Sequence, residues 1–262
     1  MLEDDFTYVI RKAFKGLAMA PTEAARLAGL PENQVLAFSR GEFSADVARQ
    51  LAPILGLAPD ALANHYGYQP RPLALQEIQR IEMSFDDERV NAWLIKTDDA
   101  TILFDTGHLP HDCQDAVSQL GISKIDQIFI THEHPDHIGG ISSFLKKEIA
   151  LYGSNIPGSA QIAPGETIDS GSLTVRACDL SGHAVPALGY HLQGLSLPIL
   201  VAGDALFAGS MGGCYTTERY QLALRSLKSV LTPLPDQTII LPGHGPATSL
   251  GEERLRNPFL AF

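Results

Sequence analysis

Cysteine is scarce in this chain, with three residues in 262, at positions 113, 178 and 214. An odd number at such wide spacing does not give the paired pattern of a disulfide-stapled secreted domain. The sequence also has no apolar run of the ~18 residues that a membrane span needs. Its first residues, Met1-Leu2-Glu3-Asp4-Asp5, are acidic and lack the pattern of a signal peptide. We therefore expect reduced thiols, a cytoplasmic location and no membrane partner.

Positive charge is also in short supply. The chain has 19 Lys and Arg against 30 Asp and Glu, a net charge of −11 at pH 7. Because contacts between phosphates and basic side chains supply most of the affinity for nucleic acid, this balance argues against a nucleic-acid partner and against RNA processing. The hydrophobic content of 45% is that of an ordinary globular protein. The length allows one large domain, or one domain and a small second one.

What the chain does contain is a dense cluster of metal-ligand side chains. Residues 131–137 read Thr-His-Glu-His-Pro-Asp-His and follow an apolar run, Ile125–Ile130, that predicts a buried strand. Pro135 and the pair Gly139-Gly140 predict a turn that is neither regular helix nor strand. Imidazole and carboxylate without thiolate suit zinc, iron or manganese in a catalytic site. A His-rich surface loop is the alternative, which the ligand-type residues farther along the chain disfavour.

This cluster resembles the signature of the metallo-β-lactamase fold, and four other motifs resemble that family in the same order. The resemblance covers about Leu73 to the C-terminus and implies an α/β fold, a four-layer αββα sandwich preceded by a small all-α region. Residues 203–207 and 242–246 are most similar to the glyoxalase II-like hydrolases. The four motifs are Ile102-Leu103-Phe104-Asp105-Thr106-Gly107, Gly182-His183, Gly203-Asp204 and Pro242-Gly243-His244-Gly245.

The resemblance also implies a site with two divalent metal ions, zinc first, with iron or manganese as alternatives. The bridging ligand would be Asp204, and Asp105 would orient a metal-binding His from behind. A water between the cations would lose its proton near neutral pH and act as the nucleophile, which makes Asp136, Asp204 and Asp105 the catalytic carboxylates. Outside the family pattern, Asp105 and Asp204 would be ordinary turn residues. The first metal would take His132, His134 and His183, and the second would take Asp136, His137 and His244.

Three functions compete on this basis. The first is hydrolysis of a small-molecule thioester or related ester, as the glyoxalase II-like branch implies. The chain continues only 18 residues past His244, too few for the glutathione-binding helical domain of that branch, so glutathione binding stays undecided. The second is a mononuclear iron persulfide dioxygenase, which resembles the same fold and uses His132, His183 and Asp204. The third is a metal- or metabolite-responsive DNA-binding regulator.

The third function depends on residues 1–69, which read as a domain of five short helices. Residues 69–72 are the predicted linker, and residues 70–262 are the predicted catalytic domain. Helix, turn and helix here resemble a repressor-type helix-turn-helix domain, with Asn33, Gln34 and Arg40 as candidate DNA contacts. However, six basic and eight acidic residues give this region a net charge of −2, which offers little to phosphates. We expect instead that one of Val35, Leu36 and Phe38 exceeds what a small core buries, which would leave an exposed aromatic or aliphatic side chain. That side chain would mark a surface that packs on another subunit, as a homo-oligomer, or on the catalytic domain near its mouth.

The remaining patterns predict elements that surround the site. Cys178 alternates with apolar residues in a strand at 173–178 and is interpreted as core. Residues 209–215 predict a flexible loop near the mouth, in which Cys214 has no base partner that would make it a nucleophile. Other strands are predicted at 73–85, 90–95, 101–104, 150–153, 189–192, 198–202 and 238–241, and helices at 112–120, 138–147 and 217–231.

Overall fold

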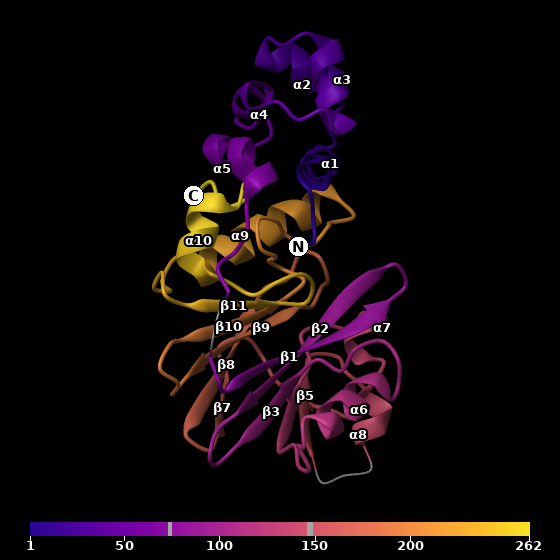
Figure 1. Ribbon diagram of the computed structural model, residues 1–262, viewed down its shortest axis with the longest axis vertical. Coiled ribbons are helices and arrows are strands. Elements are labelled where there is room, and N and C mark those ends of the chain that lie inside the picture. Colours follow the sequence, from indigo (N-terminus) through magenta and orange to yellow (C-terminus); the bar gives the residue numbers. More distant parts are fainter. Residues whose placement is uncertain (73–74, 146–148) are drawn as a thin grey trace.

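The computed structural model describes residues 1–72, 75–145 and 149–262, and its centre is a pair of six-stranded sheets packed face to face (Figure 1). The first sheet runs in chain order from β1 to β6, and the second runs β12-β11-β10-β9-β8-β7. The first contains β1 (Ile78–Phe85), β2 (Glu88–Lys96), β3 (Thr101–Phe104), β4 (Gln127–Phe129), β5 (Ala150–Gly153) and β6 (Ala160–Gln161). The second contains β7 (Thr167–Ser170), β8 (Leu173–Asp179), β9 (Leu188–Gln193), β10 (Ile199–Gly203), β11 (Ile239–Pro242) and β12 (Thr248–Ser249).

Apolar side chains fill the space between the sheets. The rings of Phe104, Phe129 and Tyr190 form its centre, with centroid separations of 5.1 to 5.6 Å. The four residues of β3 and the five of β10 are all buried, because each strand is covered on both faces. Burial of this aromatic surface removes it from water and is the main term that holds the two sheets together.

Helices cover the outer face of each sheet and complete four layers, as the sequence predicted. The first sheet carries α6 (Asp112–Gln119), α7 (Pro135–Ile138) and α8 (Ile141–Phe144). The second carries α9 (Thr217–Leu231) and α10 (Leu250–Arg256). The Thr216 side chain caps α9 by accepting a hydrogen bond from Arg219 N. The bounds of α9 are those that the sequence predicted.

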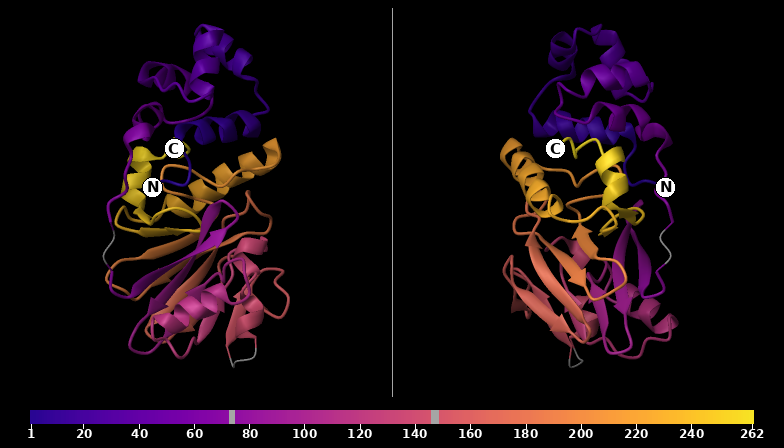
Figure 2. Two further views of the ribbon diagram at one scale, coloured as in Figure 1. Left: turned by 45° about the vertical axis from the view of Figure 1, so that its right-hand side comes forward. Right: turned by 90° about the vertical axis from the view of Figure 1, so that its left-hand side faces the viewer.

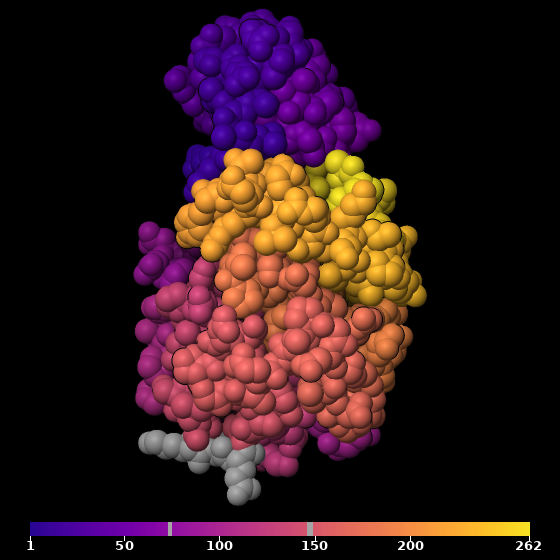
Figure 3. Space-filling model, turned by 180° about the vertical axis from the view of Figure 1, so that it is seen from behind, coloured from indigo at the N-terminus to yellow at the C-terminus, as the bar shows by residue number. Residues whose placement is uncertain are grey.

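The first 67 residues form a fifth layer that lies over α9 and α10 (Figures 1 and 2). Seen from behind, this layer is a lobe that sits directly on the two C-terminal helices (Figure 3). The Asp5 carboxylate caps the first helix by accepting from Thr7 N, and Gly29 ends the second with a positive φ of 66°. The layer contains α1 (Phe6–Gly16), α2 (Pro21–Ala28), α3 (Glu32–Ser39), α4 (Ala45–Leu51), α5 (Pro59–Asn64) and the 3₁₀ turn η1 (His65–Gly67).

No break in packing separates this layer from the sandwich among the described residues, because one continuous apolar cluster runs from α1–α5 through α9 and α10 to the outer face of β10 and β11. Gly16 lets α1 approach the Tyr220 ring of α9 so closely that a Cβ at Gly16 would lie 2.3 Å from it. The backbone of Ala58 donates a hydrogen bond to Pro258 O at 2.7 Å. The helices before residue 69 and the sandwich after it therefore share one packed core.

The expectation that α3 carries an exposed aromatic is wrong. Val35 and Phe38 are both 0% exposed, because the Phe6 ring packs against Phe38 at 4.9 Å and against Phe43 at 5.1 Å. The prediction offered packing on another subunit or on the rest of the chain. In the structure the helices pack on the rest of the same chain. The candidate DNA contacts Asn33, Gln34 and Arg40 are exposed, and their role stays a prediction.

Two predictions around the His-rich motif are also corrected. Pro135 does not prevent helix but begins one, since proline tolerates the first helical position, where its missing N–H has no partner to lose. The single helix predicted at 138–147 is divided at Gly139-Gly140. A Cβ at Gly139 would lie 1.7 Å from His108 O, so the chain turns there against the backbone of the neighbouring loop. Leu73 and Lys147, the outer ends of two predicted elements, lie outside the described residues.

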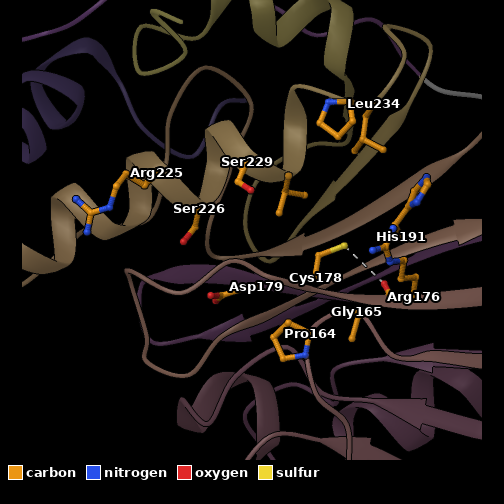
Figure 4. A pocket seen from close by; sticks show the side chains of 13 residues that line it. Pro164, Gly165, Arg176, Cys178, Asp179, His191, Arg225, Ser226, Ser229 and Leu234 are labelled. Atoms are coloured by element: carbon orange, nitrogen blue, oxygen red, sulfur yellow. Dashed lines mark hydrogen bonds between the residues drawn. The ribbon is translucent and has the colours of Figure 1, made fainter.

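The interpretation of Cys178 as a core residue is wrong, and the flexibility of the loop at 209–215 stays a prediction. The residues of β8 that enter the core are Leu173, Val175 and Ala177, so Cys178 points outward and is half-buried. It lines a cavity of about 530 Å³ between β8, β9 and α9, together with His191 (Figure 4). The loop is mostly buried, because α1 and α10 cover it.

We expect that Gly16→Ala lowers the free energy of unfolding of the sheets by about 1–3 kcal/mol, because its new methyl group overlaps the Tyr220 ring. The readout is urea denaturation followed by the fluorescence of Trp93, the single tryptophan, which lies in β2. The control is Gly67→Ala, whose Cβ meets no atom within 4 Å. An unchanged Trp93 transition in Gly16→Ala would mean that the helices and the sandwich unfold independently.

Candidate metal centre

The predicted ligands gather at one end of the sandwich because of how its strands pair. Strand β3 is parallel to β4, and β10 is parallel to β11, so the carboxyl ends of each pair meet at the same edge. Asp105 follows β3, His132 comes three residues after β4, and Asp204 follows β10. His244 comes two residues after β11 and lies beside them. Residues far apart in the chain therefore meet in one place.

All seven predicted ligands fall into two groups that share one residue. In each group, the ligand atoms lie within 4.8 Å of one another. The first group is His132, His134, His183 and Asp204, and the second is Asp136, His137, Asp204 and His244. His108 and His111, which the sequence left unassigned, lie outside both groups.

Asp204 is the shared member, and its two oxygens face different imidazoles. Its Oδ1 lies 3.2 Å from His137 Nε2, while Oδ2 lies 3.5 Å from His183 Nε2 and 3.4 Å from His244 Nε2. Asp136 Oδ2 approaches the same His244 nitrogen at 3.2 Å. One carboxylate therefore stands between the two clusters and contacts both.

Three of the imidazoles are oriented by hydrogen bonds on the nitrogen that faces away from the clusters. His183 Nδ1 donates to Gly213 O at 2.7 Å, and His244 Nδ1 donates to Arg89 O at 2.7 Å. His137 Nδ1 lies 2.8 Å from Asp105 Oδ2. Because a carbonyl or carboxylate only accepts, Nδ1 of each ring carries a proton and Nε2 is the nitrogen that faces the site.

Asp105 also anchors the strand that carries the motif. It accepts from Thr131 N and from Thr131 Oγ1, both at 2.8 Å. Its φ of 59° places it in the left-handed region, which a short polar side chain tolerates better than most. This arrangement agrees with the role behind a His ring that the family resemblance implied for Asp105.

The site is built to hold cations. Within the described part of the chain, His132 Nε2, His137 Nε2 and Asp204 Oδ1 are buried without a hydrogen-bond partner, which is costly unless another group satisfies them. Burial opposes charge on His137, but Asp204 and Asp105 outweigh it and raise the pKa of His137 to about 10. Burial likewise opposes charge on Asp204, yet His137 and His244 hold its pKa well below the usual range. Nitrogen and oxygen donors in this density, without thiolate, fit divalent metal ions.

The two groups differ in access. His134 and His183 are half-buried, whereas Asp136, His137 and His244 are buried. A small molecule therefore reaches the first group more directly than the second. Sequence patterns did not identify the supports of this site: the carbonyls of Gly213 and Arg89, and buried Asn91, whose amide donates to Pro242 O and Gly245 O around His244. Every residue has a backbone carbonyl, so the sequence does not mark which carbonyls will accept. Only the glycine-rich run at residues 209–213 pointed to one of these supports, the Gly213 carbonyl.

A family model, the metallo-beta-lactamase superfamily, matches residues 85–173. The chain is 26% identical over 198 residues to the probable metallo-hydrolase YqgX of Bacillus subtilis, covering 66% of this chain and 92% of that protein. It is 29% identical over 160 residues to the hydroxyacylglutathione hydrolase GloC of Haemophilus influenzae, covering 51% of this chain and 74% of the relative.

The fold is shared with solved structures. The crystal structure of the B3 metallo-beta-lactamase BLEG-1 superposes with a TM-score of 0.60 at 24% identity, covering 70% of this chain and 99% of that one. Within the described residues, no helix is both long and apolar enough to cross a membrane. The two-sheet sandwich agrees with these structures, so the chain has the metallo-beta-lactamase fold, and residues 85–173 match the model of the superfamily.

Proposed function

We propose that this protein is a dinuclear metal-dependent hydrolase that cleaves a small-molecule thioester or related ester. The observation that carries the proposal is the position of Asp204, whose oxygens contact imidazoles of both ligand groups at 3.2 to 3.5 Å. A single carboxylate placed in this way is suited to bridge two cations. The similarity to GloC, named for its action on hydroxyacylglutathione, supports the choice of a thioester.

His132, His134 and His183 would hold one ion, and Asp136, His137 and His244 would hold the other. When bound, such ions supply a water whose pKa is close to neutral and a Lewis acid for the acyl oxygen. The protein's own contribution is geometry, because Asp105 and the Gly213 and Arg89 carbonyls fix the rings before substrate arrives. The carboxylates of Asp136 and Asp204 both approach His244 Nε2, and they would accept hydrogen bonds from an attacking water and orient it.

The reaction adds water across the acyl carbon–sulfur bond and releases a carboxylic acid and a thiol. No side-chain nucleophile is needed. Burial raises the pKa of the Cys214 thiol to about 11, so it stays protonated at neutral pH. Its sulfur lies 3.9 Å from Gly212 O, an acceptor that cannot act as its base.

The mononuclear dioxygenase predicted as an alternative would use only His132, His183 and Asp204. It gives no role to His137 Nε2, which is buried and unpartnered within the described residues, or to the Asp136–His244 contact at 3.2 Å. The dinuclear hydrolase uses all of these groups and is therefore preferred. Zinc is our first choice of metal, since the donor set suits it, and iron and manganese fit the same donors.

We expect about two metal ions per chain at saturation. In Asp204→Ala we expect loss of thioester hydrolysis and weaker binding of both metals, because this residue would bridge them. Elemental analysis of protein loaded with metal and then desalted gives the stoichiometry, and a chromogenic thioester gives the activity. The control is Cys214→Ser, which should keep both properties because the thiol is not the nucleophile. A saturated stoichiometry of one, or full activity in Asp204→Ala, would contradict the dinuclear assignment.

A second prediction concerns Asp105. In Asp105→Asn the new amide N–H group would face His137 Nδ1, which would then have to give up its proton and place it on Nε2. We expect metal affinity to fall about 10- to 100-fold, measured by competition with a chromophoric chelator. The control is Asp126→Asn, at a carboxylate that accepts from Thr101 N at 2.9 Å outside the site. Equal affinity of the two variants would show that Asp105 does not set the ring.

A further inference from the structure

Residues 207–213, here named the 207–213 loop, lie against the metal centre on their inner side. Gly213 O accepts from His183 Nδ1, and the Phe207 ring packs edge-on against the His244 ring with centroids 5.7 Å apart. A Cβ at Gly212 would lie 2.0 Å from Asp204 O and 3.0 Å from the His183 ring. The loop is therefore in contact with both ligand groups, and a shift of Gly212 or Gly213 would disturb the contacts that hold His183.

On its outer side the same loop rests on helix α1. Lys12 Nζ donates to Met211 O at 2.8 Å and lies 5.2 Å from the centre of the Phe207 ring. Lys12 Cε is 3.9 Å from the place where a Cβ at Gly213 would be. The ammonium group of Lys12 thus holds Met211 and lies over Phe207, which packs on His244, while its side chain passes beside Gly213, which holds His183.

The charge of Lys12 is balanced within the same contact. Asp4 pairs with Lys12 Nζ through Oδ2 and accepts a hydrogen bond from Ser210 Oγ with the same atom. The Lys12 and Asp4 side chains are only 17% and 7% exposed. An ion pair buried this far gains little stability over apolar packing, because both charges lose their hydration. Its geometry, with three contacts to one loop, suits a role in fixing position.

Other side chains hold the loop at its first half. His65 Nε2 donates to Gly209 O at 2.9 Å, and Glu253 accepts from Gly209 N at 2.8 Å. Asn257 donates to Phe207 O and Ser210 O. These contacts end at Ser210, whereas Lys12 contacts Met211 and approaches Gly213, the segment next to His183. Loss of Lys12 would therefore release the part of the loop that matters most for the ligand.

We propose that Lys12 is a positioning residue of the metal centre, which sets the orientation of His183 and the packing on His244 through the 207–213 loop. The inference rests on the proposed ligand roles of these two histidines. Helix α1 then belongs to the catalytic unit, and the N-terminal layer has a function within the enzyme that does not require a nucleic acid or a second subunit.

The test compares Lys12→Met combined with Asp4→Asn, which removes both buried charges together, with Lys15→Met as matched control. Lys15 lies one turn farther along α1, is exposed, and contacts the exposed Tyr215 ring at 5.0 Å. The readouts are metal affinity by chelator competition and the visible absorption spectrum of the Co²⁺-loaded protein, both taken well below the unfolding temperature of each variant. Lys12→Met alone, with Trp93 fluorescence as the check on folding, is the second variant.

We expect the double variant to bind metal about tenfold more weakly and to show an altered Co²⁺ spectrum, as for other residues that act behind a ligand. Lys15→Met should match the unmodified protein in both readouts. An unchanged affinity and spectrum in a folded Lys12 variant would overturn the proposal, even if its unfolding temperature had fallen. Thioester hydrolysis by the unmodified protein is measured separately. Because the Lys12 test uses metal affinity and the Co²⁺ spectrum, its result does not depend on whether the proposed reaction is correct.

Discussion

The carboxylate of Asp204 is the group on which the rest of the site depends. It is buried between imidazoles of two clusters, and burying a charge is costly unless opposite charges or cations surround it. The fold meets that requirement by ending β4, β10 and β11 at the same edge, so that His137 and His244 approach the same carboxylate. Burial of the Asp204 charge is unfavourable by itself, but the position between two groups of imidazoles that causes this burial also suits Asp204 to bridge two metal ions.

The side chains of the site are held by neighbouring groups, which are themselves held by residues farther from the site. Asp105 and the carbonyls of Gly213 and Arg89 hold the rings, and the 207–213 loop that contains Gly213 is held in turn by Lys12, His65 and Glu253. Those three residues come from the two ends of the chain. The N-terminal helices share one apolar core with α9 and α10, and this core fixes Lys12 and His65 against the loop, as the proposed positioning role requires.

Much of this architecture could be predicted from local pattern. Helix α9 has the predicted bounds Thr217–Leu231, because a capping threonine and an apolar stripe define its start and its buried face. The αββα layers and the seven clustered side chains also agree with the motifs. Three local predictions failed where neighbours decided the outcome. The helix at 138–147 is divided at Gly139-Gly140, where the backbone of His108 leaves no room for a Cβ. Phe38 is buried by Phe6 and Phe43, and Cys178 faces α9 instead of the core.

The sequence by itself determined which residues have ligand chemistry and where most strands and helices form, since both follow from residue type and from periods of a few positions. Only the tertiary structure decided which of them meet. His183 contacts His134 across 49 positions, and Lys12 contacts Met211 across 199. No local pattern encodes contacts at such separation. They exist because the strands pair in parallel, the sheets stack, and a continuous apolar core holds the first helix against the last layer, which places Lys12 of α1 against the loop that holds His183.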